Sequence, residues 1–341
     1  MELAFTEDQL MLRDTVRELF RREGSADQLR AVWNGDATRF DRVWSTLGDM
    51  GVLTMCAGKN AGGMGMTELD LVLLLEEAGR AALPDPLVET AAVAVPLLAA
   101  AEGATAARWL DVLGGGKAMA AVAFPGQQHI VFGADADLIL AWHEDELHAV
   151  AGDAVAATPV QSVDRARPLA TVSWQPGADT LLARGVAVYD ARTRAHQRGA
   201  LGAAAQLCGL TQHMLDMTVD YVKNRHQFGR PIGSFQALKH KLADTFINLE
   251  FARPVVYRAA YALAENDPDA ALFVSAAKAR ASDAALSGAK ACLQCHGAMG
   301  YSFEYDLHMW MKRAWTLAAA WGDARWHRRQ VGNNLFAKRG S

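Results

Sequence analysis

The chain has 341 residues, of which 51% are hydrophobic and 21% are charged. A chain of this length can bury a large apolar core and is expected to form more than one domain. Its formal net charge of -4 excludes a general affinity for nucleic acids and other polyanions.

Residues 1–118 are predicted to form an N-terminal helical domain. The acidic start Met1 to Gln9 does not resemble a signal peptide, and the apolar run Ala91 to Ala101 is too short to cross a bilayer. We therefore expect a cytoplasmic protein without membrane insertion. Apolar residues recur at helical spacing from Leu10 to Phe20, and a capping box from Thr6 to Gln9 precedes them.

A second helix is predicted from about Asp41 to Met50, and a Gly-rich segment follows at residues 58–66. Glycine-rich loops can hold phosphate groups, but no strand precedes this one and no Walker-type lysine follows it. The segment is therefore interpreted as a close-packed turn, after which Thr67 to Asp70 open the next helix.

The pattern changes between residues 119 and 192, which are predicted to form a small, reduced central β domain. Short runs of β-prone residues are separated there by glycine, proline and aspartate, which is typical of short strands joined by turns. The predicted strands are Met119 to Phe124, Leu138 to Trp142, Glu146 to Ala151, Ala170 to Trp174 and Ala187 to Tyr189.

Residues 193–341 are predicted to form a C-terminal four-helix bundle. The spacing of apolar residues predicts helices from Leu207 to Tyr221 and from Leu238 to Leu249, and Pro254 should kink or interrupt the second of them. Further helices are predicted from Ala270 to Cys295 and from Leu307 to Gln330.

The cysteines raise the question of a metal or haem site, because Cys292, Cys295 and His296 match the C-x-x-C-H pattern of haem attachment. That chemistry needs export and oxidative maturation, for which we find no signal. Zinc would need a second pair of ligands, and Cys56 and Cys208 are single and distant. We therefore expect no metal, and buried thiols in an alanine-rich helix.

The most informative stretch is RHQFGRPIGSFQ, from Arg225 to Gln236, between two predicted helices. It places two arginines, two glutamines and two phenylalanines around a tight turn. A guanidinium can pair with a phosphate group, and flat apolar rings can pack against a heterocycle. These are the two requirements for binding the ADP half of a dinucleotide.

This stretch resembles the flavin-binding motif of the acyl-CoA dehydrogenase family. A second motif of the family occurs as QCHGAMGY at Gln294 to Tyr301, followed by Glu304, and a shorter match is EEAGR at Glu76 to Arg80. The order of helical domain, small β domain and helical bundle is also similar to that of the family. The resemblance covers nearly the whole chain, and it implies an α+β fold that is mainly α, with FAD as the cofactor.

In the family, FAD lies across a subunit interface, and the C-terminal bundle binds the ADP part of the neighbouring subunit's flavin. The resemblance implies that Arg225 pairs with the pyrophosphate and that Phe228 packs near the adenine. The alternative is that Phe228 and Phe235 are core rings and that Arg225 caps the end of a helix. The expected cofactor-binding residues are Arg225, Gln227, Phe228, Gln236, Gln294 and Gly297.

The resemblance also implies a catalytic glutamate, which takes the α-proton while the β-hydride passes to the flavin. The family places it near the C-terminus or, in some branches, on the first helix of the bundle. These positions fall on Trp321 and near Gly199, and no glutamate occurs between Glu146 and Glu250 or after Glu304. The identity of the catalytic base is therefore unknown.

Asp323 lies two residues beyond the expected base and could in principle replace it. A helix turns by about 200° over two positions, so this side chain should face away unless a helix begins there. Capping of a helix or an ion pair is the favoured interpretation.

The β domain departs from the family pattern as well, because residues 123–129 run almost directly into the next strand. The family segments that hold the isoalloxazine ring and the thioester are largely missing there.

These departures favour a non-catalytic subunit. The residues expected to serve a neighbour's flavin are kept, whereas the base and the chain's own flavin site are eroded. The chain resembles the short subunit of actinobacterial α2β2 dehydrogenases that act on steroid-derived CoA esters. This implies a homologous catalytic partner subunit, an acyl-CoA substrate and an electron-transfer flavoprotein. Two alternatives stay open: a self-sufficient homo-oligomeric dehydrogenase with an unusual base, and a flavin-free assembly protein.

Overall fold

The computed structural model describes residues 4–337, so that the first three residues of the acidic start and residues 338–341 lie outside the described part. The chain divides into two compact units. One, here called the helical unit, combines residues 1–26, 72–83 and 200–341, and the other, the mixed unit, combines residues 27–71 and 84–199. The predicted class, an α+β fold that is mainly α, is confirmed. The domain limits at residues 118 and 192 stay a prediction.

The mixed unit contains two small sheets. The four-stranded sheet has the order β1-β3-β4-β7, and the three-stranded sheet has the order β2-β6-β5. β1 pairs with β3 in parallel, with Ala120 opposite Leu138, and the other strand pairs of these sheets are antiparallel. The strands are β1 (Ala120–Ala123), β2 (Ile130–Val131), β3 (Leu138–His143), β4 (Glu146–Ala151), β5 (Ala156–Val160), β6 (Leu169–Ser173) and β7 (Leu181–Arg184).

The helices of the mixed unit are short. The Gly-rich segment among them is a close-packed turn, as expected, because a Cβ atom on Gly63 would lie 2.2 Å from the carbonyl oxygen of Ala57. η3 is a π-helical segment, and all of its residues are buried. The helices are α2 (Ala26–Asn34), α3 (Asp41–Asp49), η1 (Val52–Thr54), η2 (Lys59–Ala61), η3 (Val88–Ala94), α5 (Val95–Ala100), α6 (Ala104–Gly114) and η4 (Gly152–Ala154).

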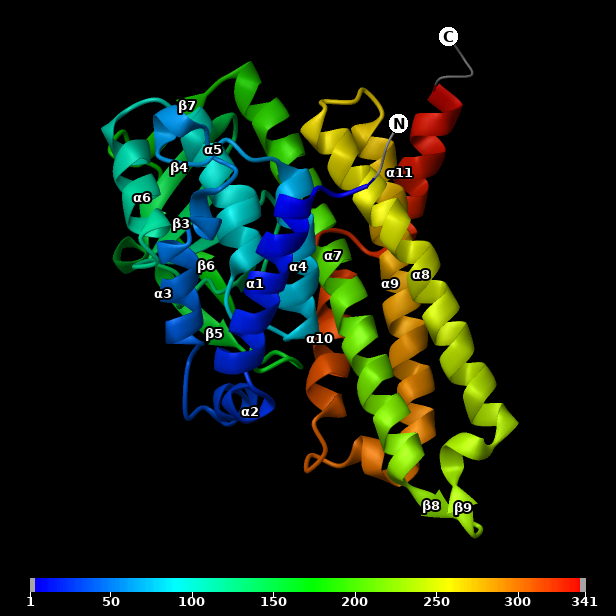
Figure 1. Ribbon diagram of the computed structural model, residues 1–341. Coiled ribbons are helices and arrows are strands. Elements are labelled where there is room, and N and C mark those ends of the chain that lie inside the picture. The colour runs from blue at the N-terminus through cyan, green and yellow to red at the C-terminus, as the bar shows by residue number, and fades with distance from the viewer. Residues whose placement is uncertain (1–3, 338–341) are drawn as a thin grey trace. The chain divides into compact units, whose positions relative to one another are not determined.

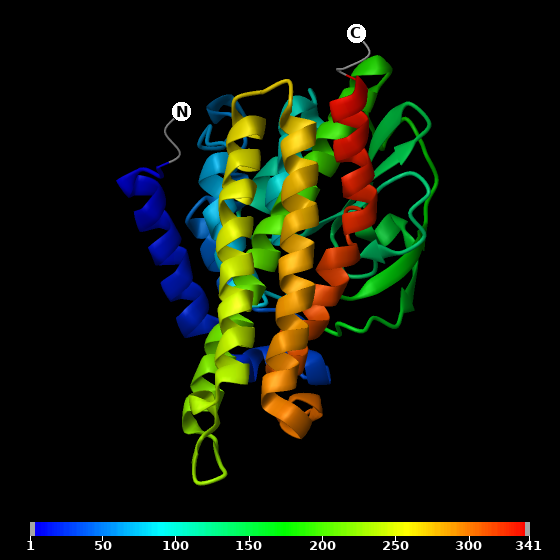
Figure 2. The ribbon, with the colours of Figure 1, turned by 90° about the vertical axis from the view of Figure 1, so that its right-hand side faces the viewer.

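The helical unit is built on long helices, of which α8 and α9 run side by side (Figures 1 and 2). The capping box of α1 is confirmed, since Gln9 N donates to Thr6 Oγ1 and Thr6 N to Gln9 Oε1. Two helices, α4 and α7, begin in the mixed unit and continue into this one. The elements are α1 (Glu7–Glu23), α4 (Glu68–Arg80), α7 (Val186–Asn224), β8 (His226–Gln227), β9 (Arg230–Pro231), η5 (Ile232–Ser234), α8 (Gln236–Ala264), α9 (Ala270–His296), η6 (Gly297–Tyr301), α10 (Leu307–Ala319) and α11 (Ala324–Ala337).

Two boundary predictions are wrong. The strand predicted from Ala187 to Tyr189 is the first turn of α7, because the chain leaves β7 through Gly185 at a φ of +89° and then begins the helix. Of the two effects predicted for Pro254, the interruption of the helix is wrong, because α8 continues through this residue, and the kink stays a prediction. Ala252 and Val256 on either side of the proline are buried, so packing outweighs the hydrogen bond that the proline cannot donate.

The predicted single helix from Leu307 to Gln330 is also wrong, because it is divided into α10 and α11. Trp321 has a φ of +58° and Gly322 a φ of +91°. Left-handed backbone conformations cannot continue a right-handed helix, so the chain turns at these residues. None of the helices within residues 4–337 is long and apolar enough to cross a membrane.

Candidate cofactor-binding site

The RHQFGRPIGSFQ stretch forms a small β-hairpin that projects beyond the ends of the neighbouring helices (Figure 2). His226 pairs with Pro231 and Gln227 with Arg230, which leaves Phe228 and Gly229 as a two-residue turn. Two-residue hairpin turns of the I′ type need positive φ at both positions. Phe228 has a φ of +53° and Gly229 a φ of +76°, so a bulky aromatic residue occupies a conformation that L residues rarely adopt.

The side chains of this hairpin point outward. Phe228 is 90% exposed, so the interpretation of this ring as part of the core is wrong. Its ring meets the half-buried Phe235 edge-on at 6.1 Å between centroids, and the Arg230 guanidinium lies 4.2 Å from the Phe235 ring centre. Arg225 is exposed, and within residues 4–337 its guanidinium has no hydrogen-bond or ion-pair partner. It therefore does not cap a helix with its side chain.

The second predicted motif lies where α9 ends. Gly297 has φ +60° and ψ -136°, a backbone conformation that glycine alone adopts readily, and the space where a Cβ atom would lie is open. Gln294 is exposed, one turn before this end. Between them, the buried His296 ring stacks on Tyr221 at 4.3 Å and its Nδ1 donates to the carbonyl oxygen of Cys292. Burial lowers the pKa of His296, which keeps the ring neutral.

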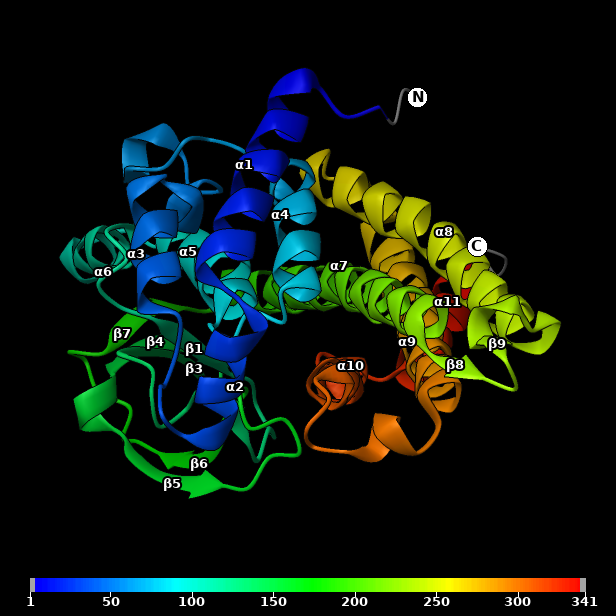
Figure 3. The same cartoon turned by 60° about the horizontal axis from the view of Figure 1, so that its bottom comes forward.

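The fold brings both motifs to one end of the helical unit (Figures 1 and 3). An apolar cluster joins Val222 at the end of α7, Ile232 after the hairpin, Leu238 of α8 and Cys295 of α9. Gln236 begins α8 beside the hairpin, and the Gln227 amide donates to the carbonyl oxygen of His226. All six residues expected to bind the cofactor, Arg225, Gln227, Phe228, Gln236, Gln294 and Gly297, thus belong to elements that meet at this end.

The arrangement fits the ADP half of FAD. It offers a guanidinium without an internal partner, an exposed ring, exposed amide groups and a glycine at which the backbone can be approached closely. Nε2 of His296 is in addition a buried polar atom without a partner among the described residues. The cysteines take no part: Cys292 and Cys295 are buried thiols, as expected, and burial raises the pKa of Cys292 to about 12.

The turn between α10 and α11 contains Trp321, the position at which the family resemblance implies a catalytic carboxylate. Asp323 stands at the start of α11, where its Oδ1 accepts a hydrogen bond of 2.7 Å from the Trp326 amide. This bond lowers the pKa of the exposed Asp323 carboxyl below its ordinary value of 3.8. The side chain caps the helix, as the favoured interpretation expected, and a carboxylate of lowered pKa is a poor general base at neutral pH.

Lys278 stabilises this turn, a role that was not predicted from the sequence. Its ammonium is completely buried and donates to the carbonyl oxygens of Ala318, at 3.1 Å, and Gly322, at 3.0 Å. His327 Nε2 lies 2.9 Å from the carbonyl oxygen of Trp321. The sequence does contain a signal that Lys278 is buried, because it shares a helical face with apolar or small residues, the buried Val274 among them. A lysine on a buried face needs internal acceptors.

Two domain models of one family match the chain: acyl-CoA dehydrogenase, N-terminal domain, over residues 6–117, and acyl-CoA dehydrogenase, C-terminal domain, over residues 185–336. The architecture of a small β region between helical parts is that of this class of dehydrogenases. The chain belongs to the acyl-CoA dehydrogenase family.

Two similar relatives are both named acyl-CoA dehydrogenase IpdE2. The protein of Mycobacterium tuberculosis is 31% identical over 309 residues, which cover 90% of this chain and 91% of the relative. That of Mycolicibacterium smegmatis is 32% identical over 334 residues, which cover 97% of this chain and 100% of the relative.

Solved structures share the fold over nearly the whole chain. The ChsE4-ChsE5 complex from Mycobacterium tuberculosis superimposes with a TM-score of 0.86 at 23% identity, covering 98% of this chain and 99% of the other. The Tcur3481-Tcur3483 steroid ACAD G363A variant gives a TM-score of 0.85 at 24% identity, covering 98% and 99%. At these identities the similarity establishes the fold alone.

Proposed function

We propose that this chain is a subunit of an FAD-dependent acyl-CoA dehydrogenase and completes the flavin site of a homologous catalytic partner in an α2β2 assembly. The observation that carries the proposal is Phe228 at the tip of the hairpin. Its ring is 90% exposed, and its backbone conformation is strained. An exposed aromatic ring on a strained turn does little for the stability of its own chain, which supports a contact outside it.

In this proposal each residue of the bundle end has a role. Arg225 pairs with the pyrophosphate as a charge-assisted donor, and Phe228 packs beside the adenine. Gln236 and Gln294 orient the nucleotide through their amide groups, and Gly297 lets the backbone approach it. Gln227 supports the hairpin and donates its remaining N–H. The bound FAD supplies the hydride acceptor of the dehydrogenation.

The partner supplies the base. The position of the family's carboxylate holds Trp321, and the nearby Asp323 is committed to the cap of α11. The first helix of the bundle offers no substitute, since no glutamate occurs between Glu146 and Glu250. Removal of the α-proton of the substrate therefore requires a carboxylate from another chain.

The substrate class is an acyl-CoA thioester, and we propose a steroid-derived CoA ester. Two relatives that cover most of this chain carry the name acyl-CoA dehydrogenase, and a steroid ACAD shares the fold. One of the similar structures is a complex of two named components, which supports a heteromeric assembly. An electron-transfer flavoprotein is the expected acceptor of the electrons from the reduced flavin.

The proposal is tested by producing the chain alone and together with a candidate homologous catalytic subunit. Alone, the chain should contain little FAD and show no acyl-CoA dehydrogenase activity. The assembly of both chains should contain FAD, bleach on addition of its substrate and yield one flavin site for each pair of chains. A yellow, active homo-oligomer of this chain would contradict the proposal and favour the self-sufficient alternative.

A further inference from the structure

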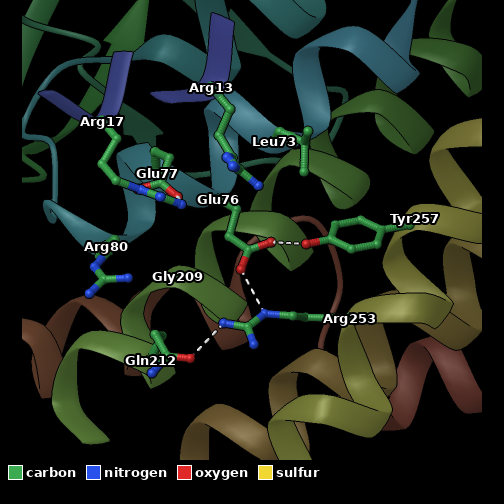
Figure 4. A pocket seen from close by; sticks show the side chains of 10 residues that line it. All are labelled: Arg13, Arg17, Leu73, Glu76, Glu77, Arg80, Gly209, Gln212, Arg253 and Tyr257. Carbon is green, nitrogen blue, oxygen red and sulfur yellow. Dashed lines mark hydrogen bonds and ion pairs between the residues drawn. The ribbon is translucent and has the colours of Figure 1, made fainter. Parts of the chain in front are cut away.

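A second polar site lies in the helical unit and shares no residue with the candidate cofactor site. It is a pocket of about 290 Å³ lined by side chains of α1, α4, α7 and α8 (Figure 4). Its floor is the close crossing of α4 and α7. A Cβ atom on Gly209 of α7 would lie 1.9 Å from the carbonyl oxygen of Glu76 of α4, so only glycine allows this approach.

Two carboxylates line the pocket, and both are satisfied by partners within it. Glu76 accepts hydrogen bonds from Arg253 Nε at 2.8 Å and from the Tyr257 hydroxyl at 2.6 Å. Glu77 accepts one of 2.6 Å from Arg17 Nη2. Both glutamates are buried, at 8% and 5% exposure. A buried carboxylate that is paired in this way attracts no further cation, so the pocket is not a cation site.

Positive charge is in excess on the lining. Four guanidinium groups, those of Arg13, Arg17, Arg80 and Arg253, face the two carboxylates. Arg17 Nε is buried and has no acceptor among the described residues. Among the residues that the structure describes, the guanidinium of Arg80 donates only through Nη2, to Asp216 at the rim. Donors are thus left over on two walls of the pocket.

Three carboxylates at the rim also pair with these arginines. Asp14 pairs with Arg13 and Arg17, Asp216 with Arg80, and Glu250 with Arg253. All three side chains are between 44% and 56% exposed, where water screens their charge. The positive charge of Arg80 still acts on the neighbouring His213, whose pKa falls to about 4, mainly through burial and further through this guanidinium.

We infer that this pocket binds the oxyanion group of a small molecule, a phosphate or a carboxylate, between Arg13, Arg17 and Arg80. Planar guanidinium groups bind such oxygens through paired, charge-assisted hydrogen bonds. The oxyanion accepts hydrogen bonds from the guanidinium N–H groups that the carboxylates of the lining and the rim leave over, while the remaining volume holds the body of the ligand. The inference does not rest on the proposed function.

Titration calorimetry tests the inference with the full chain in chloride buffer at constant ionic strength. Inorganic phosphate should bind saturably. Arg17→Gln and Arg80→Gln should each weaken its Kd at least tenfold, whereas Arg21→Gln, which changes an exposed arginine of α1 outside the pocket, should leave the Kd unchanged. Arg80→Gln leaves the partners of both buried glutamates in place, so it remains informative if Arg17→Gln fails to fold.

Further titrants separate the sources of the oxyanion. Coenzyme A that binds tighter than phosphate, with the same loss in Arg80→Gln, assigns a phosphate-bearing ligand. Succinate that binds tighter than phosphate, again with that loss, assigns a carboxylate. Absence of saturable binding for all three compounds overturns the inference. Equal binding by the original chain and both glutamine variants would show an adventitious ion only, and also overturns it.

Discussion

Two turns of the helical unit have similar backbone conformations but different roles. The hairpin has a positive φ at Phe228, and the turn between α10 and α11 has one at Trp321. Around Trp321 the polar groups bind one another, because Lys278 and His327 reach the carbonyl oxygens of the turn. Around Phe228 the ring and the guanidinium of Arg225 are left to the solvent.

A strained backbone therefore does not by itself mark a binding site. At Trp321 the strain is offset inside the chain by buried hydrogen bonds, which is the pattern of a structural element. At Phe228 no contact of comparable strength with residues 4–337 offsets it, since the main ring contact is the edge of Phe235 at 6.1 Å. Strain combined with exposure is the observation that supports a partner at the hairpin.

The largest effect is expected from Lys278→Met, which breaks the internally satisfied turn. The buried carbonyl oxygen of Ala318 and the half-buried one of Gly322 lose their donor, so the free energy of unfolding should fall by about 2–4 kcal/mol. Urea denaturation measures the change. Lys290→Met, at an exposed position of the same helix, is the matched control and should stay within about 0.5 kcal/mol of the original chain. If Lys278→Met and Lys290→Met were equally stable, Lys278 would have no structural role in the turn.

Arg225→Ala tests the outward-facing hairpin. Loss of a charge-assisted pair with the pyrophosphate should lower the affinity of the assembled complex for FAD at least tenfold, or by about 1.4 kcal/mol or more. The stability of the isolated chain should not change, because the guanidinium has no partner within residues 4–337. Arg325→Ala, at an exposed position of α11, serves as the control. Unchanged flavin content in Arg225→Ala would favour the flavin-free assembly protein.

Phe228→Gly separates stability from binding at the same hairpin. Glycine relieves the positive φ, so the isolated chain should be as stable as before or more stable by up to about 1 kcal/mol. Loss of the ring should weaken FAD binding by the complex about two- to tenfold, the range expected for one aromatic contact. Phe228→Tyr keeps the ring and should retain the affinity. A large loss of stability in Phe228→Gly would show that the ring serves its own chain.

Local signals in the sequence were sufficient for the tight turn between α7 and α8, although the two short strands β8 and β9 that flank it were not predicted. The capping box of α1 and the run from Arg225 to Gln236 act over a few residues, and the structure shows them where they were predicted. The break between α10 and α11 was not predicted, although Gly322 and Asp323 are local signals for it. The hydrogen bonds that stabilise it could not be predicted in this way, because Lys278 is 40 residues from Ala318 along the chain. The exposure of Phe228 decides between the two interpretations that the sequence left open, since a phenylalanine between two helices is also compatible with a core position.

The smallest effect is expected from Asp323→Ala, which decides between a cap and a base. Loss of the capping bond to the Trp326 amide should lower the melting temperature slightly, and Asp323→Ser should recover most of the loss, because serine also caps helices. The pKa of Asp323 is lowered in the folded chain, so its stabilisation is fully present above the ordinary value of 3.8. It is lost as the pH falls through the lower folded pKa, and the difference in melting temperature between the original chain and Asp323→Ala should vanish there.

In the assembled complex, bleaching of the flavin by substrate should be the same in the original protein and in Asp323→Ala. If Asp323→Ala abolished that bleaching while the protein stayed folded, Asp323 would be the base and the chain a dehydrogenase in its own right.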